Sequence, residues 1–171
     1  HGLFTWGDTA KECYDQTIDV INVATKWLAE RSEGVVPFGG AVHQSLSEEK
    51  RRSIAARLMP AIRGFVSGNQ HMVGHFNDSD TVLEFVNARD MQPLAALGTS
   101  CPDHFLRTKI RPLVVPFDPA KGNIDDVLAG LPDQVDVYRK DYAAYYDRCK
   151  HDNSPALLYP NAVVYLVPGV G

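Results

Sequence analysis

The sequence carries a nearly continuous apolar run, Ala162-Val163-Val164-Tyr165-Leu166-Val167. A run without alternating polar residues is typical of a strand buried on both faces of a parallel sheet. Residues 81–86 and 110–115 are also rich in β-branched and apolar side chains, and Pro112 favours the start or an edge of the second of these strands. The predicted fold class is therefore α/β. We expect a small parallel sheet of three or more strands (81–86, 110–115 and 162–167) with right-handed crossovers, flanked by helices and preceded by a helical segment.

Between these predicted strands, apolar residues recur at helical spacing, which indicates helices that cover the sheet. Residues 89–97 and 124–131 are expected to form short helices, and a long helix should follow with Pro132 in its first turn. One face of the long helix carries Val135, Tyr138, Tyr142, Tyr145 and Cys149. We interpret this tyrosine stripe as packing against the sheet, because aromatic residues at helical spacing form core more often than a ligand site.

The amino-terminal part is expected to be helical after a short aromatic strand at residues 1–8. Asp8 or Thr9 should cap the helix, and Glu12, three residues after Thr9, would complete a capping box. The apolar residues recur at helical spacing and predict one broad buried face, made by Tyr14, Ile18, Ile21 and Leu28. Residues 32–40 contain two valines, a proline and three glycines, and are predicted to be a linker.

A further helix should begin after Ser45 or Ser47, and Pro60 should kink it or divide it in two. Its buried stripe is expected to be Ile54, Leu58, Ile62 and Phe65. The basic residues of this segment are interpreted as a solvated face. Residues 71–76 are expected to form a short edge strand.

Composition excludes several classes of protein. The 171 residues carry a net charge of -4, and no RNA-binding, zinc-finger or basic-aromatic motif is present, so we expect no nucleic-acid partner. No apolar run approaches the roughly 20 residues of a membrane span, and a cytoplasmic setting is expected. Cys13, Cys101 and Cys149 are odd in number and far apart, which favours reduced thiols. His71 and His75 are four residues apart, but Gly74 between them makes a metal site there a minor alternative.

The densest group of polar side chains lies in residues 98–109. Thr99 or Ser100 is the expected cap of a short helix, with Pro102 in its first turn. The free amides of a helix start, together with hydroxyl and cationic side chains, suit a phosphate or carboxylate. The candidate anion-binding or substrate-binding residues are Thr99, Ser100, Asp103, His104, Arg107 and Lys109. The alternative is an ordinary capped helix with a solvated Asp103–Arg107 pair.

Two glycines in residues 168–171 permit close approach of a ligand at the carboxyl edge of the predicted sheet. Because no helix follows these residues in the sequence, they are a weak match to a phosphate-binding loop. An ordinary loop that follows the strand is the favoured interpretation. The chain begins at His1 without an initiator methionine and stops soon after an apolar strand-like run. We therefore expect it to be part of a longer polypeptide.

Two motifs carry a resemblance to a known family. The first, His1-Gly2-Leu3-Phe4-Thr5-Trp6-Gly7-Asp8 with the helix after it, resembles the carboxyl end of a class II aldolase/adducin-type domain. The second, PDHFLRTK at residues 102–109, resembles the middle region of bifunctional rhamnulose-1-phosphate aldolase/short-chain alcohol (lactaldehyde) dehydrogenases. Residues 141–146 and 163–171 continue this likeness, which covers essentially the whole chain. It implies that residues 1–40 are the end of an aldolase-like domain plus a linker. Residues 41–171 would be a helical segment and an α/β connecting domain leading toward a dehydrogenase.

The resemblance also implies cofactors. In this family the histidine of the HG motif is one of the ligands of the catalytic zinc, so His1 is the candidate metal ligand, and the other ligands would lie upstream. NAD would belong to a following dehydrogenase domain, whose TGxxxGxG and YxxxK motifs have no match here. The resemblance assigns no role to the PDHFLRTK segment and identifies no catalytic residue.

Three functions are compatible with the sequence. The chain is a fragment of a bifunctional lyase and oxidoreductase that is inactive by itself, an α/β module that binds an anion or a sugar phosphate, or a structural connector between two catalytic domains. The first describes the parent protein, and for the local role the connector is slightly favoured. The expected partners are flanking aldolase and dehydrogenase domains, with a sugar phosphate and further copies of the chain as alternatives, and without nucleic acid or membrane.

Overall fold

The computed structural model describes residues 2–68, 70–99 and 101–171. Residues 1–37 and 38–171 form two compact units. The elements are α1 (Ala10–Ser32), a 3-10 helix η1 (Pro37–Gly39), α2 (Glu48–Val66), α3 (Asp80–Val86), α4 (Met91–Leu97), α5 (Pro102–Thr108), β1 (Leu113–Val114), α6 (Ile124–Cys149) and β2 (Tyr165–Leu166). No helix in the described ranges is both long enough and apolar enough to cross a membrane.

The first unit is built around α1. Thr9 is its N-cap: the Thr9 hydroxyl accepts from the Glu12 amide at 3.2 Å, and the Glu12 carboxylate accepts from the Thr9 amide at 3.1 Å. The predicted capping box is confirmed. The strand predicted for residues 1–8 is wrong for residues 2–7, which form no ladder, and the Thr5 hydroxyl instead meets that of Thr17 at 2.6 Å. The broad buried face predicted for α1 is also not found, because no residue of α1 is buried.

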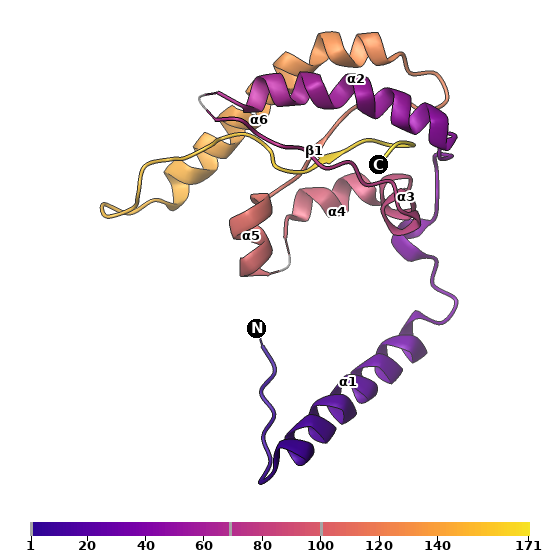
Figure 1. The fold of residues 1–171 in the computed structure, drawn as a ribbon, viewed down its shortest axis with the longest axis vertical. Coiled ribbons are helices and arrows are strands. Elements are labelled where there is room, and N and C mark those ends of the chain that lie inside the picture. Colours follow the sequence, from indigo (N-terminus) through magenta and orange to yellow (C-terminus); the bar gives the residue numbers. More distant parts are fainter. Residues whose placement is uncertain (1, 69, 100) are drawn as a thin grey trace. The chain divides into compact units, whose positions relative to one another are not determined.

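The core of the second unit lies between two long helices and a pair of strands. Figure 1 shows α2 and α6 side by side, and they are in contact. The strands β1 and β2 are parallel, with Leu113 opposite Tyr165 and Val114 opposite Leu166. The chain runs from β1 through α6 to β2, so the predicted parallel pair joined by a helix is confirmed. The buried core is made by Leu58, Leu113, Val115, Phe117, Val127, Leu131, Val135, Ala162, Val167 and Val170.

Residues 81–86 form helix α3 rather than the predicted strand. Ser79 is the N-cap, and its amide donates to the Asn77 side chain at 3.0 Å in a turn that leads into the helix. Leu83 and Val86 are buried at a helical i, i+3 spacing. The intrinsic β preference of this segment is overridden, because a helix directs both side chains into the interior. The described part of the sheet therefore has two strands instead of the predicted three or more.

Both long helices continue through a proline. α6 includes Pro132, so the short helix 124–131 and the long helix predicted after it are one element. α2 likewise runs through Pro60 without being divided. An interior proline removes one backbone hydrogen bond, but buried residues stand before and after Pro132, namely Leu131 and Val135, so the packing of α6 continues past it.

The edge strand predicted for residues 71–76 is absent, and the Met72 carbonyl instead accepts a hydrogen bond from the Arg63 guanidinium at 2.9 Å.

The last residues of the chain are held by a buried asparagine. The Asn87 side-chain oxygen accepts from the Gly169 amide at 2.7 Å, and its nitrogen donates to the Ser45 hydroxyl at 2.9 Å. The Gly169 carbonyl accepts from the Leu46 amide at 2.9 Å. Gly169 has φ +76°, and a Cβ there would lie 2.4 Å from Pro119. This segment is a buried structural turn, which agrees with the prediction of an ordinary loop after the strand. The Gly169 amide is already hydrogen-bonded within the protein.

Candidate functional site

The predicted anion-binding residues lie on and beside α5. This helix has seven residues, and Cys101 rather than Thr99 stands at its N-cap, without a side-chain cap bond. The expected cap by Thr99 is therefore wrong, and Ser100 lies outside the described residues. An extended Cys101, with φ -142°, leads directly into Pro102, the first residue of α5.

The six predicted residues are only partly brought together. Asp103, His104 and Arg107 are exposed on α5, and no hydrogen bond or ion pair joins their side chains within the described structure. The Thr108 hydroxyl donates to the His104 carbonyl at 2.8 Å. Lys109 is directed to α6 instead, so the exposed histidine and arginine are the accessible part of the predicted set.

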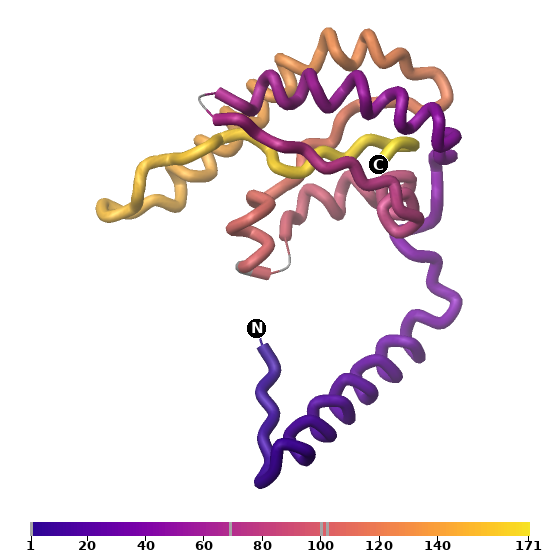
Figure 2. Tube along the Cα trace, in the orientation of Figure 1, coloured from indigo at the N-terminus to yellow at the C-terminus, as the bar shows by residue number. Residues whose placement is uncertain are grey.

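A pocket of about 660 Å³ lies between α4, the segment of β1 and α6. Figure 2 traces the backbone of these three segments, all of which belong to the second unit. Its walls are mostly apolar and aromatic, with charged groups from the loop before β1 and from α6. The lining residues most relevant to its chemistry are Arg111, Gln134, Tyr138, Asp141, Tyr142, Tyr145 and Arg148. A pocket of this size that combines apolar walls with a few polar groups is the usual form of a small-ligand site.

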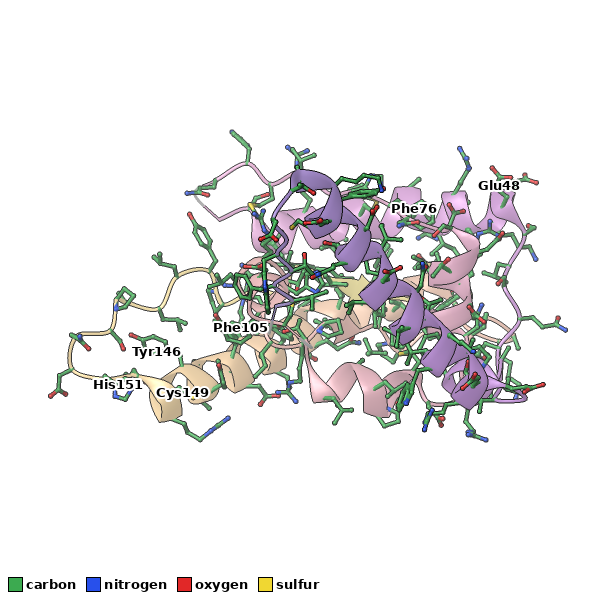
Figure 3. The ribbon with its side chains drawn as sticks, turned by 90° about the horizontal axis from the view of Figure 1, so that it is seen from below. Glu48, Phe76, Phe105, Tyr146, Cys149 and His151 are labelled. Carbon is green, nitrogen blue, oxygen red and sulfur yellow. The ribbon has the colours of Figure 1, made fainter. Side chains whose placement is uncertain are left out.

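An aromatic cluster fixes one end of this pocket. The rings of Tyr142 and Tyr145 are 6.1 Å apart at 37°, and Phe105 of α5 meets Tyr145 edge-on at 6.2 Å. Figure 3 labels Phe105 beside α6, and it labels Tyr146, Cys149 and His151 toward the carboxyl end of that helix. The Lys109 ammonium lies 4.8 Å from the centre of the Tyr142 ring and 3.4 Å from its hydroxyl. Aromatic and cation–π contacts thus fasten α5 to α6 and hold the tyrosine rings in place.

Two polar side chains among the lining residues differ in whether they have a hydrogen-bond partner. The Tyr138 hydroxyl donates to the Arg111 carbonyl at 2.7 Å, and burial raises the pKa of this tyrosine to about 12. Tyr138 therefore remains a neutral donor at physiological pH. The side-chain oxygen of Gln134 is buried and has no hydrogen-bond partner among the described residues. A buried acceptor without a donor costs free energy.

The sequence identified the tyrosine stripe but not its role in a pocket. Tyr138 packs against the core that contains Leu113 of β1, as predicted, whereas Tyr142 contacts Lys109 and Tyr145. Both tyrosines also line the pocket. Gln134 was not identified as a candidate. It stands four residues before Tyr138 on the same helix face, and this placement of a polar side chain on an apolar stripe was the available signal.

The described residues give no set of metal ligands. No three histidine, cysteine, aspartate or glutamate side chains among them come together in a way that would hold a metal ion. The candidate zinc ligand His1 lies outside the described residues. Cys13, Cys101 and Cys149 are free thiols, as the sequence predicted.

Comparison with known proteins relates the chain to a family of aldolase domains and to a protein that is named as an oxidoreductase. Residues 53–171 match the model of a protein family described as "Aldolase class II, second domain". The whole chain is 36% identical over 171 residues to a protein of Bacillus subtilis (strain 168) that is named "Uncharacterized oxidoreductase YuxG". The chain spans 25% of the length of that relative. No solved structure shows a significant match.

Proposed function

Because this chain belongs to the family of class II aldolase second domains, we propose that it is the connecting domain of a bifunctional enzyme. The enzyme would combine a class II, zinc-dependent sugar-phosphate aldolase with a short-chain, NAD-dependent dehydrogenase, as in rhamnose breakdown through rhamnulose 1-phosphate and lactaldehyde. The observation that carries the proposal is the joint match. An aldolase domain family covers residues 53–171, and a relative named as an oxidoreductase aligns with all 171 residues.

The proposal divides the chain by role. Residues 1–40 would complete an aldolase domain and provide a linker, and residues 41–171 would connect that domain to a dehydrogenase in a cytoplasmic protein. Zinc would be held mainly by donors upstream of this chain, with His1 as the donor contributed here. NAD would be bound downstream. Further copies of the chain would be the partners in any homo-oligomer.

The geometry of the second unit supports a connecting role. Its core is closed by contacts distant in sequence: α2 packs on α6, and β1 pairs with β2. Arg139 adds a polar junction, since it donates to the Asn161 side chain at 2.7 Å and to the Phe65 carbonyl at 2.8 Å. A domain with its own core can hold a defined structure between neighbouring domains.

The first prediction tests the division of activities. We expect the 171-residue chain alone, supplied with zinc and NAD, to show neither cleavage of rhamnulose 1-phosphate nor oxidation of lactaldehyde. A longer polypeptide in which the chain is joined to aldolase and dehydrogenase sequences should show both activities. Coupled assays for dihydroxyacetone phosphate and for NADH measure the two reactions. Turnover by the isolated chain, or neither activity in the longer protein, would contradict the proposal.

The second candidate is an anion-binding module on α5, favoured by the exposure of His104 and Arg107 outside any ion pair in the described structure. Thr99, Ser100, Asp103 and Lys109 would complete it. In this alternative, millimolar inorganic phosphate raises the melting temperature, and Arg107→Ala abolishes the rise. Arg52→Ala is the matched control, because Arg52 is an exposed helical arginine that pairs only with Glu48. We expect phosphate to leave the melting temperature of the parent chain, Arg107→Ala and Arg52→Ala unchanged. A rise in the parent chain and Arg52→Ala that is lost in Arg107→Ala would establish the anion site.

A further inference from the structure

One face of α6 is exposed along the carboxyl-terminal part of the helix. Successive residues of an α-helix turn by about 100°, and six of the residues from 133 to 148 fall within one arc of about that width. All six are exposed, and they are Asp133, Val137, Lys140, Asp141, Ala144 and Arg148. The buried residues Leu131 and Val135 lie on another side of the helix. We call the six exposed residues the α6 stripe.

The residue types of the α6 stripe follow a symmetric order. From its amino end the stripe reads acidic, apolar and basic, and from its carboxyl end it reads basic, apolar and acidic. The positions that correspond are Asp133 and Arg148, Val137 and Ala144, and Lys140 and Asp141. In a two-fold interface a residue contacts its counterpart on the other copy and the reverse contact forms as well. Two copies of the stripe laid antiparallel therefore bring opposite charges together at every charged position.

The charges of the stripe have no partners within the chain. None of its four charged side chains takes part in an ion pair among the described residues. Two neighbouring carboxylates on α6 are paired, because Asp136 meets Arg139 at 2.9 Å and Asp147 meets Lys150 at 2.8 Å. Within α6, Asp133, Asp141 and Arg148 also have no opposite charge three or four residues away. Their charges are thus free to pair with a second molecule.

The middle of the same surface is apolar. Val137 is 57% exposed between the charged positions, and Leu97 of α4, which is 80% exposed, lines the same hollow as Val137. Apolar groups at the centre and charged groups at the rim are usual in protein interfaces. Residues 133–148 extend over about 24 Å, so a face one to two helix diameters wide covers roughly 250 to 500 Å² on each copy. Such an area suits a weak, reversible association.

We propose that two copies of this chain associate through the α6 stripe, with the two helices antiparallel about a two-fold axis between Lys140 and Asp141. Asp133 of each copy then lies opposite Arg148 of the other. A partner of a single charge sign would be repelled by half of the stripe, which favours a second copy over an acidic or a basic protein. Turnover by the isolated chain would overturn the proposed function without affecting this interface. A monomeric chain would overturn the interface without affecting the proposed function.

The first measurement is sedimentation velocity of the 171-residue chain from about ten micromolar to about one millimolar, a range that spans weak affinities. We expect a reversible change from monomer to dimer as the concentration rises. The dimer should weaken when sodium chloride is raised from about 0.05 M to about 0.5 M, because ion pairs at a surface are screened by salt.

Charge reversal tests the antiparallel arrangement. Asp133→Arg places an arginine opposite Arg148 at both ends of the interface and should weaken association at least tenfold, and Arg148→Asp should do the same. The double variant with both changes should regain the parent affinity, because arginine and aspartate have exchanged places. An equimolar mixture of the two single variants should also form dimers, since each arginine then meets an aspartate.

A change in the apolar centre gives an independent measurement. Val137→Glu should weaken association at least tenfold, because it buries a carboxylate in the interface. Val73→Glu is the matched control, since Val73 is 95% exposed and lies outside α6, and it should leave association unchanged. All of these positions are exposed, so far-UV circular dichroism should show the same helix content in every variant.

Three results would overturn the proposal. One is a chain that stays monomeric at about one millimolar in low salt. Another is association that Asp133→Arg, Arg148→Asp and Val137→Glu leave unchanged, which would place the contact elsewhere on the chain. The third is failure of both the double variant and the mixture to restore dimers, because Asp133 and Arg148 would then not lie opposite each other.

Discussion

Replacing Leu131 with alanine should lower the free energy of unfolding by about 3 kcal/mol, the typical cost for a fully buried leucine. Leu131 has no exposed surface and lies directly before Pro132 in α6, among the buried residues that form the core of the second unit. The loss combines the transfer energy of the removed carbons with the cavity left behind, which Val127 and Val135 one turn away on the same helix cannot fill without moving. Urea unfolding followed by far-UV circular dichroism measures the change.

Leu106→Ala is the matched control, because Leu106 is also a helical leucine but is 78% exposed. Its replacement should change stability by less than about 0.5 kcal/mol. Equal effects of the two substitutions would show that α6 does not form the centre of the core. A loss in Leu131→Ala of less than about 1 kcal/mol would lead to the same conclusion.

The parts of the fold that the sequence predicted are those in which local signals agree with tertiary packing. Thr9 and Glu12 form the capping box, and the cap of α2 is Ser47, whose hydroxyl accepts from the Lys50 amide at 3.4 Å. The parallel pair was predicted because the strand-like segments 110–115 and 162–167 are separated by a helical segment. In each of these cases the favoured local conformation also places the apolar side chains inside.

The errors occur where local preference and packing differ. Residues 81–86 contain two valines, a threonine and a phenylalanine, which favour a strand, but burial of Leu83 and Val86 requires a helical repeat. Pro132 is typical of a first turn, yet α6 extends eight residues before it. Such a short run with two possible periods cannot be assigned from the sequence, because the deciding contacts come from distant segments.

The candidate site was predicted in its residue types more than in its location. Residues 98–109 were predicted to bind an anion because polar side chains are dense in this part of the sequence. In the structure, however, Lys109 contacts Tyr142 of α6. The pocket is assembled from residues within the three separate segments 92–97, 110–116 and 133–148, so local spacing could not reveal it. Arg111 and α6 come together only in the folded chain, where the Tyr138 hydroxyl donates to the Arg111 carbonyl.

Asn87→Ala should lower the free energy of unfolding by about 2 to 3 kcal/mol, through loss of buried hydrogen bonds rather than loss of apolar packing. Asn87 is 3% exposed, and its side chain connects the Gly169 amide with the Ser45 hydroxyl. Its carbonyl also accepts from the amides of Val42 and His43, and these backbone bonds remain after the substitution. The main cost is therefore the Gly169 N–H, which is left buried without an acceptor.

Two variants separate this cost from the general effect of removing an asparagine. Asn77→Ala also removes an oxygen that accepts from a backbone amide, that of Ser79, but at an exposed position, and it should cost at most about 1 kcal/mol. Ser45→Ala removes only the partner of the Asn87 nitrogen and should cost about 1 kcal/mol. Hydrogen exchange gives a local measurement, in which the Gly169 amide should lose protection in Asn87→Ala and retain most of it in Ser45→Ala. If Asn87→Ala and Asn77→Ala were equally stable, or if the Gly169 amide stayed protected in Asn87→Ala, the buried asparagine would not be what holds residues 168–171 to the core.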